Sequence, residues 1–144
     1  MIIAGTAGGN SSISNCENVT VAIPLSAPVL DPIVPAVDGD GIIDLNWSDV
    51  VGATTYYVFR DTSNITSVVG LTPIASVSES NYTDTLVTNG IYYYVIVAGD
   101  AWANGSISNC ENVTVAIPPS APVLDPIVPA VDGDGIIDLN WSDV

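Results

Sequence analysis

Three aspartates, Asp38, Asp40 and Asp44, surround a glycine-containing turn, and the same pattern recurs as Asp132, Asp134 and Asp138. Hard cations such as Ca²⁺ bind several oxygen ligands on flexible loops, and alternating Asp residues with Gly supply them. The segment lacks the distal bidentate Glu of an EF-hand. Asp and Gly are also favoured in β-turns for backbone reasons alone. We therefore favour an acidic turn here and keep a Ca²⁺ site as the alternative.

Acceptor sequences for N-linked glycans, Asn-x-Ser/Thr, form a second constellation. They begin at Asn10, Asn18, Asn46, Asn64, Asn81, Asn104, Asn112 and Asn140. Chance would give about two, although repetition within the sequence inflates the number. Asn46 and Asn112 fall on the outward side of their predicted strands, where a glycan fits. The alternative is that Asn, Ser and Thr are simply abundant in loops and on exposed strand faces. Occupied sites would place the chain outside the cell.

One aromatic residue lies in a loop that could meet a partner. Trp102 belongs to the loop 99–105, and the equivalent position of an earlier copy is Gly8. An exposed loop Trp can anchor a partner protein or a sugar ring. We expect this indole instead to fold back over the end of its domain, with the binding role as the alternative.

The chain lacks the residues that most catalytic sites use. It has no His and no Lys, and Arg60 is its one basic residue. Without His the commonest general base is missing, and without Lys neither Schiff-base nor P-loop chemistry is available. Only carboxylates or the N-terminal amine could activate a nucleophile, so we expect no enzyme activity and no required cofactor.

The net charge of the chain limits the classes of partner that it can bind. The 16 Asp+Glu against one Lys+Arg give a net charge of -15. Nucleic acids and anionic membrane surfaces need Lys and Arg contacts, so neither is an expected partner. No run of about 18 apolar residues could insert into a bilayer as a helix, and residues 1–5 are too short for a signal peptide. The 48% hydrophobic content is still enough for a folded core.

The sequence contains an internal repeat, and several of the residues named above occur in both copies. Residues 12–50 and 106–144 match at an offset of 94, and of 39 aligned positions only Leu25 and Pro119 differ. Pro-rich joints mark the limits of the repeating unit, because proline cannot donate to a sheet ladder and stiffens a linker. We predict one complete unit at 25–118, the C-terminal strands of a preceding unit at 1–24, and the N-terminal strands of a following unit at 119–144.

Each copy of the repeat carries one cysteine, Cys16 or Cys110. No disulfide can therefore form within a single unit. We expect two free thiols, and an intermolecular disulfide, or one between neighbouring units, is the alternative.

The complete unit has the pattern of short strands separated by turns. Residues 43–48 alternate between apolar and polar side chains, which predicts one buried and one solvated face. Tyr56 and Val58 share one side of the next strand. Residues 91–98 are almost continuously apolar, as in a central strand, and 112–117 alternate again. No segment shows a helical period, so the predicted fold class is an all-β sandwich.

Particular residues sharpen this prediction. They are Ala27-Pro28-Val29-Leu30 in an opening strand, Leu45-Asn46-Trp47, Tyr56-Tyr57-Val58-Phe59-Arg60, and Tyr82-Thr83-Asp84 with Leu86. Together they resemble the fibronectin type III family, an immunoglobulin-like β-sandwich. The resemblance implies that Tyr92 is the corner tyrosine, whose hydroxyl bonds to the backbone, and that Tyr94, Ile96 and Ala98 point inward. Near-identical tandem copies of this kind are typical of large prokaryotic, including archaeal, surface proteins. The chain has no Arg-Gly-Asp, so integrin-type adhesion is not implied, and the cysteine lies outside the family pattern.

These observations predict a non-catalytic structural or adhesive repeat module of an extracellular or cell-surface protein, acting as a spacer or stalk. Its expected partners are proteins, either neighbouring repeats or further copies of itself, with a glycan as an alternative. Half-sandwiches of the size of 1–24 and 119–144 cannot stand alone, and unpaired strand edges recruit partners. A filament subunit joined by strand complementation is therefore a second hypothesis. A calcium-dependent or carbohydrate-binding accessory module is a third.

Overall fold

The chain folds into strands joined by turns and loops. The computed structural model describes residues 2–21, 23–86, 88–127, 133 and 135–143. In chain order the strands are β1 (Gly5–Thr6), β2 (Gly9–Asn10), β3 (Val37–Asp38), β4 (Ile42–Asn46), β5 (Thr55–Asp61), β6 (Ala75–Val77), β7 (Asn81–Thr85), β8 (Gly90–Gly99), β9 (Asn104–Ile107) and β10 (Glu111–Val115). In this part of the chain no helix is long and apolar enough to cross a membrane.

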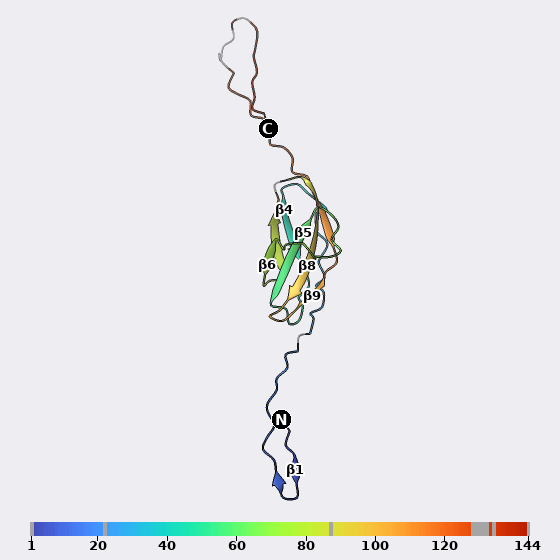
Figure 1. The fold of residues 1–144 in the computed structure, drawn as a ribbon. Helices are drawn as coiled ribbons and strands as arrows, with labels where there is room; N and C mark the ends of the chain where they lie inside the picture. Colours follow the sequence, from blue (N-terminus) through green and yellow to red (C-terminus); the bar gives the residue numbers. More distant parts are fainter. Residues whose placement is uncertain (1, 22, 87, 128–132, 134, 144) are drawn as a thin grey trace.

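Two sheets form the middle of the molecule (Figure 1). The larger sheet has the order β3-β10-β8-β5-β6, with β9 paired to β8, and the smaller sheet pairs β4 with β7. The ladders are antiparallel except between β10 and β3. A bridge between Leu30 and Trp47 places the opening strand beside β4. The predicted all-β sandwich is confirmed.

Alternation along the strands builds the main core between these sheets. In β4 the side chains of Ile43 and Leu45 are buried, and the residues between them are exposed. Tyr56 and Val58 of β5 belong to the same apolar cluster. The inward side chains of β8 complete it, namely Tyr94, Ile96 and Ala98, each 0% exposed. The predicted inward positions of β4, β5 and β8 are therefore confirmed.

The uninterrupted apolar run of β8 reflects burial on both faces of that strand. Val95 and Val97 point away from the main core and pack with Phe59 of β5 in a second cluster. Ile65, from the loop between β5 and β6, belongs to this cluster, and Leu71 of the same loop packs against it. The loop thus covers the outer face of the larger sheet, a role that the sequence analysis did not assign to it.

Two side chains fix the chain at its turns and edges. The hydroxyl of Tyr92 donates to the carbonyl oxygen of Thr88 at 2.9 Å, which confirms the predicted corner tyrosine. The carboxamide of Asn109 accepts from the backbone N–H of Leu30 at 2.8 Å and donates to the carbonyl of the same residue at 2.9 Å. The second arrangement ties the opening strand to the segment before β10.

The segments on either side of the sandwich repeat its local contacts. Gly5 pairs with Asn10 between β1 and β2, in the register in which Gly99 pairs with Asn104. The bridge between Leu124 and Trp141 likewise repeats the bridge of the opening strand to β4. Figure 1 shows the two segments beyond opposite ends of the sandwich. Every buried residue among those described lies between positions 28 and 115, and the limits of the three predicted parts stay a prediction.

Candidate functional site

The aspartates of the glycine turn are engaged by the backbone. Asp38, at the end of β3, is 6% exposed. Its Oδ1 accepts from the backbone N–H of Asp40 at 3.2 Å and of Gly41 at 2.5 Å. The Oδ1 of Asp40 accepts in turn from the N–H of Ile42 at 2.9 Å. Gly41 has a φ of 78°, a conformation for which glycine is favoured. These bonds are those of an acidic turn.

A pocket of about 410 Å³ lies beside this turn and is lined in part by Asp38, Asp40 and Asp44. Asp44 accepts from the hydroxyl of Thr83 across the β4–β7 ladder at 2.6 Å. No group of three or more His, Cys, Asp or Glu is placed to hold a metal ion in the part of the chain that the structure describes. In the second copy Asp138 is exposed, and Asp132 and Asp134 lie outside the described residues. Ca²⁺ binding stays a prediction, and these contacts do not support it.

The single basic residue lies in an ionic cluster that joins the two sheets. Arg60 of β5 donates from Nη1 to Oδ2 of Asp84 in β7 at 2.6 Å. The hydroxyl of Tyr94 in β8, itself 0% exposed, donates to the same oxygen at 2.8 Å. The guanidinium carbon also lies 5.7 Å from the ring centroid of Tyr92. This arrangement neutralises a buried carboxylate, and the sequence has no other basic side chain that could bind an anion.

Burial and the neighbouring carboxylate shift the pKa values within this cluster. Burial raises the pKa of the Tyr94 phenol, and its hydrogen bond to Asp84 raises it further. For Arg60, desolvation lowers the pKa, but the hydrogen bond and charge of Asp84 outweigh it and the net shift is upward. Both groups are thus held in their protonated forms. Arg60 as the single basic residue and the inward position of Tyr94 could be read from the sequence, but the position of Asp84 between them could not.

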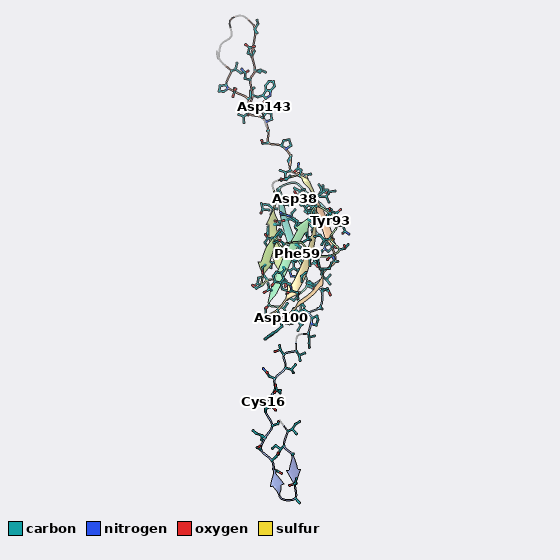
Figure 2. The ribbon with its side chains drawn as sticks, in the orientation of Figure 1. Cys16, Asp38, Phe59, Tyr93, Asp100 and Asp143 are labelled. Carbon is teal, nitrogen blue, oxygen red and sulfur yellow. The ribbon has the colours of Figure 1, made fainter. Side chains whose placement is uncertain are left out.

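The loop between β8 and β9 holds its indole away from the domain. The Oδ1 of Asp100 accepts from the backbone N–H groups of Trp102 and Ala103, each at 2.8 Å, and these bonds lower the pKa of Asp100. Trp102 is 68% exposed. Our expectation that it folds back over the sandwich was wrong, because the Asp100 carboxylate closes a tight turn that directs the side chain outward. Figure 2 shows Asp100 and Asp38 at opposite ends of the sandwich, so this loop and the acidic turn form separate sites.

Neither Cys16 nor Cys110 forms a disulfide within the chain. Cys16 is exposed in the segment before the sandwich (Figure 2), and Cys110 packs partly buried against the cluster around Val95. A bond between neighbouring chains or units stays a prediction.

All the asparagines that begin glycan acceptor sequences are exposed, namely Asn10, Asn18, Asn46, Asn64, Asn81, Asn104, Asn112 and Asn140. Asn46 and Asn81 are directly opposed in the β4–β7 ladder.

Comparison of the fold with solved structures decides its class. The solution structure of the fibronectin type III domain of human fibronectin type III domain containing protein 3 matches with a TM-score of 0.53 and 18% identity, over 70% of this chain and 94% of that one. The fold is that of a fibronectin type III domain. This chain also matches part of the crystal structure of a β-1,2-glucanase from Parabacteroides distasonis, with a TM-score of 0.53 and 27% identity. The match covers 67% of this chain and 13% of the glucanase.

Sequence comparison relates this fibronectin type III fold to parts of much longer proteins. An amylopullulanase from Thermoanaerobacterium saccharolyticum is 37% identical over an alignment 126 residues long, which covers 77% of this chain and 10% of that protein. An amylopullulanase from Thermoanaerobacter thermohydrosulfuricus is 36% identical over 88 residues, or 6% of its length. The chain thus spans a tenth or less of these relatives. No family model matches the chain.

Proposed function

We propose that this chain is a non-catalytic structural module of a large extracellular protein, in which it spaces other domains apart. The observation that carries the proposal is the placement of the connections: the chain approaches and leaves the sandwich at opposite ends (Figure 1). The segments on both sides are repeats of the sandwich's own sequence at an offset of 94. A series of such units joined end to end separates whatever it connects.

The relatives support a place within a larger protein. Only 10% of the amylopullulanase and 13% of the β-1,2-glucanase correspond to this chain. The catalytic part of such an enzyme would lie elsewhere in its sequence, since this fold offers no His and no Lys. We infer as the parent either a polysaccharide-degrading enzyme or a prokaryotic surface protein built from tandem repeats.

Small-angle X-ray scattering on proteins carrying one, two and three complete units tests the spacer function. β8 has 10 residues, so at about 3.4 Å per residue each unit should add at least about 34 Å to the maximum dimension. Growth in proportion to the number of units supports the proposal. A maximum dimension that stays constant, because the units fold against one another, would contradict it.

Carbohydrate binding is a second candidate function, and the exposure of Trp102 favours it. An aromatic ring held outward by a fixed turn offers a flat apolar surface, on which a sugar ring can stack. Retardation in gels containing pullulan or β-1,2-glucan, the polymers in the relatives' names, would detect binding. Trp102→Ala should abolish the retardation, and equal mobility of both proteins with and without polymer would remove this candidate.

Self-association is a third candidate, and it rests on exposed apolar side chains in the flanking segments. Trp141 is 59% exposed where its counterpart Trp47 is 5% exposed, and Val19 is 84% exposed where Val113 is 0% exposed. Segment 1–24 of a second copy could cover the apolar face of 119–143, because the equivalent segments meet in the sandwich core. Light scattering over a hundredfold range of concentration distinguishes a rising mass from a constant 14.8 kDa, which would exclude this candidate.

A further inference from the structure

The asparagines of this chain divide into two groups with different surroundings. Three of the 11 do not begin an Asn-x-Ser/Thr sequence, and the carboxamides of all three make hydrogen bonds. Asn109 clamps the backbone of Leu30, Asn89 exchanges two hydrogen bonds with the backbone of Ile117, and Asn15 donates to Glu17.

The eight asparagines that do begin such a sequence differ from these three in their hydrogen bonding and not in their exposure, since Asn15, Asn89 and Asn109 are exposed as well. Every one of the eight is exposed. None of their carboxamides makes a hydrogen bond with another group that the structure describes. A bulky group attached to these side chains would therefore break no hydrogen bond among the described residues.

Strand alternation explains why the acceptor sequences remain accessible. Residues i and i+2 of a strand lie on the same face, so Asn and Ser/Thr point outward together while the residue between them points inward. In β10 the middle residue Val113 is 0% exposed, and Asn112 on its N-terminal side is exposed. The loop after β5 shows the same arrangement without strand geometry, since Ile65 is 5% exposed and Asn64 and Thr66 are both exposed. When the middle residue is buried, the Asn before it and the Ser or Thr after it therefore both lie at the surface.

We propose that these exposed asparagines are sites of N-linked glycosylation. The co-reactant is an oligosaccharide joined through its anomeric carbon to a lipid pyrophosphate. A bond forms between Asn Nδ2 and the anomeric carbon, and the bond from that carbon to the phosphate oxygen breaks. The lipid pyrophosphate leaves with the bonding electron pair, and the amide nitrogen loses one proton. For the native protein, this inference rests on the extracellular location proposed above.

The β4–β7 ladder limits how many glycans one molecule carries. Asn46 and Asn81 are opposed Cα partners, and such residues lie about 5 Å apart. A glycan on either side chain covers the other, so we expect at most one of the two to be occupied in any molecule.

The experiment uses the full chain, fused to an N-terminal signal peptide and secreted by yeast cells. Yeast cells transfer lipid-linked oligosaccharides to acceptor asparagines. Mass spectrometry of the intact protein and its peptides should show sugar on acceptor asparagines and none on Asn15, Asn89 or Asn109. Asn64→Gln and Thr66→Ala should each remove the sugar at position 64, and Asn89→Gln, as the matched control, should leave all sugar in place.

A secreted chain with the mass of the polypeptide alone, 14.8 kDa, would overturn the inference. So would sugar on the non-acceptor asparagines to the same extent. Because yeast supplies the export, this result is independent of the native location. Fractionation of the producing organism tests that location separately: a chain found only inside the cell would refute the extracellular role and leave the yeast result unchanged.

Discussion

Replacing Tyr94 with Phe tests whether the ionic cluster stabilises the sandwich. The ring is retained, and only the hydroxyl that donates to Asp84 at 2.8 Å is lost. A hydrogen bond to a charged group contributes about 1.5–3 kcal/mol. We therefore expect Tyr94→Phe to lower the free energy of unfolding by about 2 kcal/mol at pH 7. For a domain of this size that corresponds to a fall in Tm of roughly 8–16 °C.

Urea unfolding followed by far-UV circular dichroism measures the loss. Tyr93→Phe is the matched control, because no hydrogen bond of the Tyr93 hydroxyl is formed with the described residues and its removal should cost less than about 0.5 kcal/mol.

The pH dependence of the same pair of proteins isolates the cause. Burial, followed by the bond to Asp84, raises the pKa of Tyr94 in the folded protein, while in the unfolded chain it is about 10. Since the folded pKa is the higher one, the stabilisation is complete below about pH 10 and is lost as pH rises further, by about 1.4 kcal/mol per pH unit. The Phe variant lacks this titration. The difference in unfolding free energy between the two proteins should therefore shrink above about pH 10.

Two results would refute this reasoning. One is a Tyr94→Phe protein within about 0.5 kcal/mol of the wild type at pH 7, which would show that the hydroxyl bond contributes little. The other is a stability difference that stays constant between about pH 9 and pH 11.5, which would show that the phenol does not resist ionisation in the folded state.

Three further substitutions test the contacts of Asn109, the turn at Gly41 and the exposure of Trp102. Asn109→Ala should cost about 2–3 kcal/mol in urea unfolding because two backbone bonds of a half-buried strand are lost, whereas Asn15→Ala, at the equivalent position outside the sandwich, should leave the transition unchanged. Gly41→Ala should lower the free energy of unfolding by more than about 2 kcal/mol, since the φ of Gly41 is 78° and the new Cβ would collide with the backbone oxygen of Leu86. Gly135→Ala is the control: the φ of Gly135 is 79°, nothing lies within 4 Å of the new Cβ, and the melting curve of the sandwich should not change. Trp102→Ala should alter stability by less than about 0.5 kcal/mol, and a loss above about 1 kcal/mol would show that the indole packs on the domain.

The strands and the main core could be predicted from the sequence because their information is local. Alternation in β4 is a property of neighbouring residues, and it identifies a buried face without knowledge of the tertiary structure. The corner position of Tyr92 was implied instead by the resemblance to the fibronectin type III family. The acidic turn is local in the same sense, since Asp38 bonds to residues two and three positions later.

The features that the sequence did not reveal depend on contacts between distant segments. Asp84 meets an arginine 24 residues away, and the carboxamide of Asn109 meets a strand 79 residues away. Neither residue type is distinctive in the sequence, because Asp and Asn are abundant throughout the chain. The orientation of Trp102 was predicted wrongly because hydrophobicity favours burial of an indole, whereas a carboxylate two residues earlier fixes the turn that exposes it. The cover over the second cluster was missed since the loop between β5 and β6 has no regular period.

The ion pair of Arg60 with Asp84 has a consequence for the electrostatics of the whole molecule. Because the one basic side chain is paired with Asp84, the remaining carboxylates have no basic side chain within the chain to neutralise them. This excess of negative charge makes each unit a segment of a polyelectrolyte. Neighbouring units repel one another over a Debye length, which grows from about 8 Å at physiological salt to about 30 Å at 0.01 M. An array of these domains is therefore expected to stiffen and lengthen in dilute salt and to relax as counterions screen it.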